Sequence, residues 1–155
     1  MCEIACTLHH ENRIWPEASR VRVFMRVPGA EFPHLCTQCH DYPCVDSCPV
    51  DALSVDETTS AVIVDGDKCT SCKACITACP GRVPFLHPGN DKAIICDLCG
   101  GDPQCAKVCQ DGGWNVLRVV DRPEDASISL YAKRPAEVTR GLVTIIYGER
   151  GEELI

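Results

Sequence analysis

The sequence predicts an α+β fold in which short β-hairpins alternate with loops rich in cysteine. All 14 cysteines of the 155 residues lie before residue 110, and they fall into four groups. Short apolar runs of the kind found in β-strands separate these groups. Aromatic residues are few, with three Phe, two Trp and three Tyr, so a conventional apolar core would be thin. We therefore expect whatever the cysteines bind to hold the fold together.

Alternation of apolar and polar residues, interrupted by turn residues, predicts the elements in order. The expected elements are a loop with at most one helical turn at 7–20, a strand at 21–27 that ends at Pro28-Gly29, a hairpin that starts after Cys48-Pro49 and returns at 61–64, a strand at 93–95 and a strand at 116–120.

The C-terminal end, residues 121–155, contains no cysteine. Its pattern predicts a short helix near 125–132 and an apolar strand at 142–147. This end is too short to build a core of its own. We therefore predict a docking arm for a partner protein, with packing back onto the cysteine-rich part as the alternative.

Three of the four cysteine groups are complete quartets with similar internal spacing. Their members are Cys36, Cys39, Cys44 and Cys48 (C-x2-C-x4-C-x3-C), Cys69, Cys72, Cys75 and Cys79 (C-x2-C-x2-C-x3-C), and Cys96, Cys99, Cys105 and Cys109 (C-x2-C-x5-C-x3-C). The remaining group has only Cys2 and Cys6. These spacings are typical of bacterial iron–sulfur ligation, in which the fourth cysteine of each run binds the other cluster of a pair.

This crossing rule predicts three complete [4Fe–4S] ligand sets, because each cube needs one thiolate at each of its four irons. The sets are Cys36, Cys39, Cys44 and Cys79 for the first cluster, Cys69, Cys72, Cys75 and Cys48 for the second, and Cys96, Cys99, Cys105 and Cys6 for the third. Cys2 and Cys109 are left unassigned. A fourth cluster is expected only if the native chain begins before Met1.

Two other interpretations stay open. The C-x2-C pairs are compatible with a zinc-bound interaction module, although the third cysteine and the C-x3-C that follows fit zinc poorly. Cys2 and Cys109 could also mark an incompletely ligated catalytic cluster, but no paired carboxylates or nucleophile–base set accompany them. The five histidines do not form the two-His pattern of a Rieske centre, so we expect them at most to tune a nearby cluster.

Charge and hydropathy narrow the possible partners. The formal net charge is −7, which disfavours nucleic acid because such a partner needs a basic face. No stretch is long and apolar enough for a membrane span, and residues 1–10 show no signal peptide. We therefore expect a cytoplasmic location, where cysteine favours metal over disulfide.

Residues 2–120 resemble the four-quartet polyferredoxin subunits found beside molybdenum and tungsten pterin enzymes. The resemblance rests on the cysteine runs and on residues 2–9 and 15–21, which resemble the second half of the family's opening quartet, the His after it and the Ser-Arg pair before a strand. It implies an electron-transfer role beside a tungsten or molybdenum pterin catalytic subunit of the aldehyde ferredoxin oxidoreductase type. The likeness extends to the small subunits of tungsten-dependent class II benzoyl-coenzyme A reductases.

The expected organisation is therefore one of tandem nested modules that resemble bacterial ferredoxins. A multi-cluster domain spans 1–120, with an inner module at 36–80 and an outer module built from 2–35 and 81–120; the docking arm is 121–155. The expected function is electron relay through three clusters between a soluble donor or acceptor and the catalytic subunit, with no catalytic activity of the chain alone. Further electron-transfer subunits can join such a complex.

Overall fold

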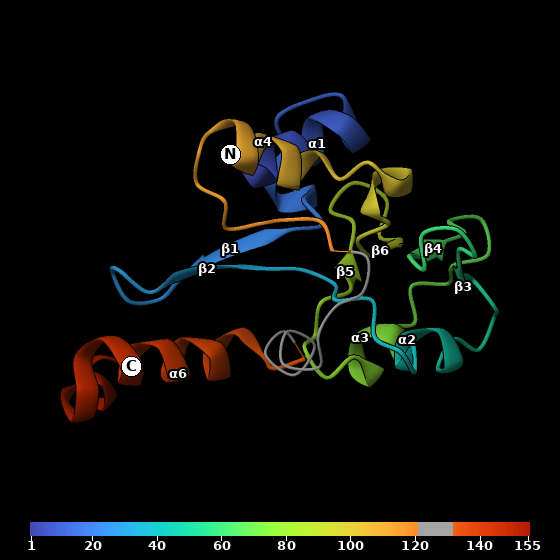
Figure 1. The fold of residues 1–155 in the computed structure, drawn as a ribbon. Coiled ribbons are helices and arrows are strands. Elements are labelled where there is room, and N and C mark those ends of the chain that lie inside the picture. The colour runs from blue at the N-terminus through green and yellow to red at the C-terminus, as the bar shows by residue number, and fades with distance from the viewer. Residues whose placement is uncertain (121–131) are drawn as a thin grey trace.

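The computed structural model describes residues 1–120 and 132–155, and it has the predicted α+β character (Figure 1). The elements of the described residues are α1 (Cys2–Glu11), η1 (Pro16–Ala18), β1 (Arg22–Met25), β2 (Glu31–His34), α2 (Pro43–Asp46), β3 (Leu53–Val55), β4 (Val62–Val64), α3 (Ala74–Ala78), β5 (Phe85–Leu86), β6 (Ala93–Ile94), η2 (Leu98–Gly101), α4 (Gln104–Asp111), α6 (Pro135–Tyr147) and η3 (Gly148–Leu154). Within this part of the chain, no helix is long and apolar enough to cross a membrane.

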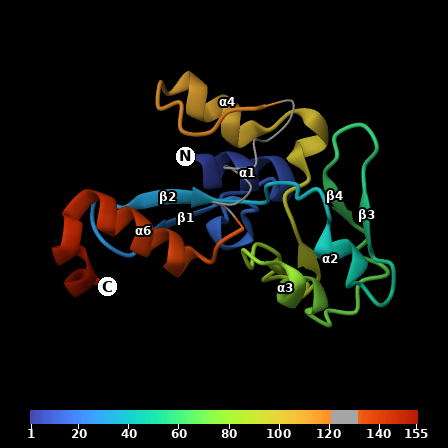
Figure 2. The same ribbon diagram turned by 60° about the horizontal axis from the view of Figure 1, so that its bottom comes forward.

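Two pairs of helices organise the cysteine-rich part. Helix α1 packs against α4, and α2 packs against α3, so the first group lies beside the last and the middle groups lie together. Figure 2 shows the two pairs at different places in the molecule, with α1 and α4 side by side. Each of these helices contains the third cysteine that the family's spacing would assign to its group: Cys2, Cys44, Cys75 and Cys105.

The β-structure of the described residues consists of three separate two-stranded antiparallel sheets. Strand β1 pairs with β2 with Phe24 opposite Phe32, and β3 pairs with β4 with Leu53 opposite Val64. The third sheet, β5 with β6, has only two residues in each strand. Isolated two-stranded sheets are marginally stable in water, so these hairpins depend on their contacts with the rest of the chain.

The largest buried cluster of side chains is small and rich in sulfur. Its buried members are Cys44, Ala52, Leu53, Val62, Cys69, Cys75, Ala93 and Ile95. It joins the β3–β4 hairpin to the helices α2 and α3 and to Ala93 and Ile95, which lie outside the predicted inner module at 36–80. The predicted strands at 21–27, 61–64 and 93–95 are confirmed in position.

The N-terminal part differs from the prediction. Residues 7–11, which belong to the predicted loop at 7–20, instead form the second half of helix α1 (Cys2–Glu11). The sequence pattern also missed β2, whose residues Glu31–His34 pair with β1. The burial of Cys6 and Thr7 against the rest of the chain explains the helix, since packing rather than propensity stabilises most short helices.

The predicted strand at 116–120 is wrong, because no strand forms there. The backbone N–H groups of Val116 and Leu117 instead donate to the Cys109 sulfur, at N–Sγ distances of 3.2 and 3.3 Å. A strand would need those donors for a neighbouring chain. The Cys109 sulfur thus takes the two backbone N–H groups that strand pairing would need.

The predicted strand at 142–147 is also wrong, because these residues belong to helix α6. Pro135 lies in the first turn, and the Arg134 N–H donates to Glu137 Oε2 at 2.7 Å, so the Glu137 side chain caps the start of the helix. Val143 is fully buried against Val27 and Ala30 at the end of the β1–β2 hairpin. The predicted helix near 125–132 lies almost wholly outside the described residues, and Ala132 is in a turn.

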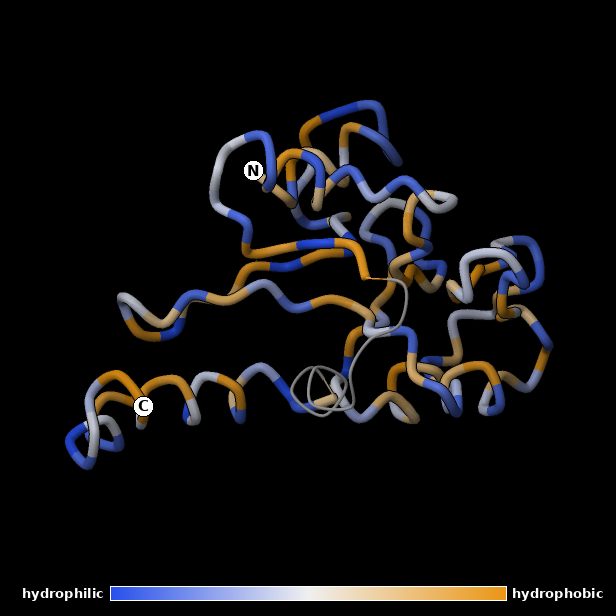
Figure 3. The backbone as a smooth tube through the Cα atoms, viewed as in Figure 1, coloured by the Kyte–Doolittle hydropathy of each residue, from blue (hydrophilic) through white to orange (hydrophobic). Residues whose placement is uncertain are grey.

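The C-terminal end folds back onto the hairpin rather than standing alone. The Tyr147 hydroxyl donates to the Pro28 carbonyl at 2.7 Å, and apolar residues gather toward the C-terminal end of α6 (Figure 3). Gly151 permits the close turn that follows, because a Cβ at that position would lie 2.7 Å from the Val143 carbonyl oxygen. One side of α6 is therefore packed, while Ile145 is 81% exposed.

Candidate iron–sulfur sites

The three complete cysteine groups share one backbone feature. The residue directly before the second cysteine has a positive φ in each: 52° at Gln38, 60° at Ser71 and 54° at Leu98. None of these is glycine, so each position carries some backbone strain. The same strained turn at equivalent places curls each loop so that successive cysteines can face a common centre.

The structure brings together Cys36, Cys39, Cys44 and Cys79. Burial raises the pKa of the Cys36 thiol to about 12, and the neighbouring Cys44, Cys39 and Cys79 add to this rise. Burial, with the nearby Cys79 and Cys39, likewise raises the pKa of Cys44 to about 11. Cys79 comes from the other quartet, as crossed ligation requires.

A second set surrounds a small cavity of about 10 Å³, which Cys48, Cys69, Cys72 and Cys75 line together. Cys48 again comes from the other quartet. Burial raises its pKa, but the backbone N–H groups of Val50, Ala52 and Leu53 outweigh this and lower it. Cys72 is the one exposed cysteine among the 14, so this site reaches the surface.

The outer set gathers residues from both ends of the cysteine-rich part. Burial raises the pKa of Cys105 to about 11, with contributions from Cys6, Cys99 and Cys2 nearby. Burial also raises the pKa of Cys96, with smaller contributions from Cys36 and Cys105. Cys96 thus belongs to the outer set and also lies near Cys36 of the first inner set.

Backbone N–H groups point at the sulfur of the last cysteine in all four groups. The donors are Arg20 to Cys6 (3.3 Å), Ala52 to Cys48 (3.3 Å), Val83 to Cys79 (3.4 Å), and Val116 and Leu117 to Cys109. Such bonds favour the thiolate and stabilise the added charge of a reduced cluster. The sulfur of the last cysteine in each group is thus held by backbone donors.

Cys2 and Cys109 line a separate open cavity of about 260 Å³. Its other walls are mainly apolar and include Val23, Phe32 and Trp114. Burial raises the pKa of Cys2. The cavity presents two of the four thiolates that a cube needs, which matches their unassigned status in the sequence.

These donor sets fit [4Fe–4S] clusters. Each complete set offers four sulfur atoms on curled loops with N–H donors around them, and no histidine or carboxylate belongs to a set. Because burial raises the pKa of several of these thiols, they lose their protons only as the metal binds. When bound, a cluster supplies one-electron redox chemistry; the residues of this chain hold it, exclude water and donate hydrogen bonds to its sulfur.

Two residues beside the outer set are His10, to which the sequence assigned at most a tuning role, and Asp97, which the sequence did not single out. His10 Nε2 lies 3.3 Å from Asp97 Oδ1 and 3.6 Å from Cys99 Sγ. Hydrogen bonds with Asp97 and Cys99 raise the pKa of His10 to about 9, despite burial. Burial raises the pKa of Asp97, but His10 and the Cys99 N–H outweigh it and lower that pKa to about 2. The i, i+4 spacing of Cys6 and His10 would have put both on one helix face, had the helix been predicted.

Comparison with known proteins decides the family. A family model described as a 4Fe-4S dicluster domain matches residues 28–119, which is more than half of the chain. The chain belongs to the 4Fe-4S dicluster family. The dicluster match contains all three complete quartets, but it excludes Cys2 and Cys6.

The chain is also similar to several curated proteins, one of which matches almost its whole length. It is 48% identical, over 96% of its length and 86% of the relative's, to the polyferredoxin-like subunit of the aliphatic sulfonate oxidoreductase of Pyrococcus furiosus. It is 35% identical to protein NrfC of Escherichia coli over 70% of its length, and there it spans only about half of the relative (54%). It is also 39% identical over 64% of its length to the hydrogenase-2 operon protein HybA of Escherichia coli O157:H7, covering 34% of that protein. The chain is thus a polyferredoxin-like iron–sulfur protein that functions in electron transfer.

Proposed function

We propose that this chain relays electrons through three [4Fe–4S] clusters between a soluble redox partner and a pterin catalytic subunit that carries tungsten or molybdenum. The observation that carries the proposal is the presence of three four-cysteine sets on loops with the same left-handed turn. The nested arrangement is supported by the packing of α1 on α4 and of α2 on α3. The proposed ligands are those assigned from the sequence.

The proposed order of the relay follows from contacts between the sets. Cys96 of the third set lies near Cys36 of the first, and Gln38 Nε2 donates to the Cys96 carbonyl at 3.0 Å. The second set reaches the surface at Cys72. Electrons would therefore pass between the Cys72 end and the Cys2–Cys109 cavity through the first and third clusters. A fourth cluster at that cavity needs two thiolates from outside these 155 residues.

Iron content tests the proposed number of clusters. The anaerobically purified chain is expected to hold about twelve irons, at four per cube, with the brown absorption of iron–sulfur clusters. Iron and acid-labile sulfide are measured per chain, together with zinc. About eight or sixteen irons would contradict the three ligand sets, and a colourless protein with stoichiometric zinc would favour the zinc-bound module.

The partner enzyme is proposed as an aldehyde ferredoxin oxidoreductase type of subunit in the cytoplasm. The resemblance of residues 2–120 to subunits beside tungsten and molybdenum enzymes supports this. Benzoyl-coenzyme A is the substrate class that the resemblance suggests, and an aliphatic sulfonate is the one suggested by the relative from Pyrococcus furiosus. Purification of the native complex, followed by metal analysis and assay of both substrates, decides between them. A complex without tungsten and molybdenum would contradict the proposed partner.

The C-terminal end, 121–155, is proposed to dock to that catalytic partner. Ile145 and Ile146 are exposed on α6, although the helix packs on the hairpin through Val143. Burying one such side chain contributes about 1.5–3 kcal/mol, which corresponds to about tenfold or more in affinity.

An Ile145→Asp substitution is therefore expected to weaken binding to the partner about tenfold or more while iron content stays unchanged. Thr144→Asp is the matched control, because Thr144 is exposed on the same helix but offers little apolar surface. Binding is measured by pull-down or titration with the purified catalytic subunit. Equal weakening by both variants, or loss of iron with Ile145→Asp, would contradict docking through this face.

A further inference from the structure

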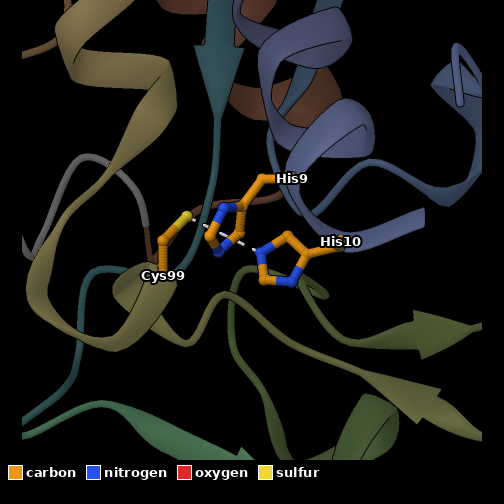
Figure 4. A group of neighbouring side chains, drawn as sticks. All are labelled: His9, His10 and Cys99. Atoms are coloured by element: carbon orange, nitrogen blue, oxygen red, sulfur yellow. Dashed lines mark hydrogen bonds between the residues drawn. The ribbon is translucent and has the colours of Figure 1, made fainter. Parts of the chain in front are cut away.

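His10 and Cys99 meet although 89 residues separate them. His10 lies in the last turn of α1, and Cys99 lies in η2, shortly before α4. The packing of α1 on α4 brings them together. Figure 4 shows the His10 ring turned toward the Cys99 sulfur, with an Nε2–Sγ distance of 3.6 Å.

Asp97 fixes the orientation of the imidazole ring. Its Oδ1 lies 3.3 Å from His10 Nε2, and the same oxygen accepts the Cys99 N–H at 2.9 Å. A carboxylate oxygen can only accept, so the proton on His10 Nε2 is shared between Asp97 and the Cys99 sulfur. The His10 side chain is 11% exposed, so little water competes for that proton.

A donor of this kind acts on the redox equilibrium of a cluster. Reduction adds one electron, no bond forms or breaks, and the extra negative charge spreads over the sulfur atoms. Hydrogen bonds to those sulfurs favour the reduced form and raise the reduction potential. Elsewhere, the backbone N–H groups of Ala52 and Ala93 donate to Cys48 and Cys69, and the Thr37 hydroxyl lies 3.7 Å from the Cys39 sulfur. The His10 bond to Cys99 comes from a side chain, so a substitution can remove it.

We propose that His10 is a positioning residue that raises the reduction potential of the third cluster by donating its Nε2 hydrogen to Cys99. The inference rests on the proposed ligand set Cys96, Cys99, Cys105 and Cys6. It assigns a role to a histidine that is not itself a ligand. Because His10 lies in α1, the position of this helix then affects the reduction potential of the third cluster.

The test compares His10→Phe with the wild-type chain in an EPR-monitored redox titration at fixed pH, with iron measured in both. His10→Phe fills similar space without a donor, so the potential of one cluster is expected to fall while the others stay in place. His10→Gln, which keeps an N–H donor, is expected to give a smaller fall. His9→Gln is the matched control, because His9 lies beside His10 at 4.7 Å between ring centroids but is exposed.

The outcomes separate this role from the alternatives. Unchanged potentials in His10→Phe, or an equal shift in His9→Gln, would overturn the proposal. If His10→Phe loses iron, His10→Gln decides: retained iron with a near wild-type potential supports the hydrogen bond, and lost iron overturns it.

A metal ion held by His9, His10 and Cys99, whose ligand atoms lie within 4.8 Å of one another, would appear as zinc or a single iron lost in both His9 and His10 variants. That result also overturns the proposal. A wild-type chain that lacks the third cluster altogether would instead mean that the proposed function is wrong.

Discussion

Removal of iron is expected to unfold the cysteine-rich part of this chain. Without iron, the largest buried cluster keeps only eight buried residues, of which Cys44, Cys69 and Cys75 are predicted ligands. The three sheets each have two strands, and the longest helix among the described residues has 13. A structural metal site can contribute about 10–16 kcal/mol, whereas a whole domain is stable by only about 5–15 kcal/mol. Losing three cluster sites would thus exceed the available stability.

The raised pKa values of three cysteine thiols also favour unfolding of the iron-free chain. The Cys36, Cys44 and Cys105 thiols, with pKa values of about 12, about 11 and about 11, are protonated near neutral pH when no metal binds. They would then be neutral groups gathered on strained loops, with little to hold those loops closed.

The measurement is circular dichroism and thermal unfolding of chelator-treated protein, against protein rebuilt with iron and sulfide. The treated form should show no cooperative transition, and rebuilding should restore it. A cooperative transition of the iron-free chain near that of the loaded form would contradict this expectation.

Replacement of Cys48 by Ser is expected to destroy the cluster of Cys69, Cys72 and Cys75, which follows Cys48 in the sequence by more than twenty residues. The reason is geometric, because Cys48 lines the cavity of that set. Cys48 also receives the Ala52 N–H at 3.3 Å, which keeps its sulfur directed as a ligand. Iron content should fall by about four, from about twelve to about eight.

Cys79→Ser is the reciprocal control, because Cys79 lies near Cys36 and Cys44. The two variants should each lose a different EPR signal and keep the other. Loss of the same signal in both, or loss of the Cys36 cluster in Cys48→Ser, would show that ligation is not crossed. Ser can itself bind iron weakly, so Ala variants at both positions check that the loss is complete.

The cysteine spacing determined a large part of the site. Cys36, Cys39 and Cys44 are close in sequence, and the short C-x2-C spacing leaves their loop few ways to curl. The β3–β4 hairpin followed from β-prone residues on both sides of a polar turn. These features depend on neighbours along the chain, so local patterns predict them well.

Local sequence patterns predicted the wrong conformation where contacts with residues far away in the sequence determine it. Residues 142–147 have β-propensity, yet they lie in helix α6, from which Val143 packs on Val27 and Ala30. Residues 116–120 do not form a strand, because the Val116 and Leu117 N–H groups donate to the Cys109 sulfur.

The sequence by itself determined the cofactor chemistry and the family, and it predicts three sets of four thiolates, because ligand type and spacing are properties of the chain. Only the tertiary structure decided that α1 packs on α4, that Cys96 lies near Cys36, and that His10 reaches Cys99 beside Asp97. Those contacts join residues far apart in the chain, so they depend on how helices and hairpins pack. No spacing rule can state them in advance.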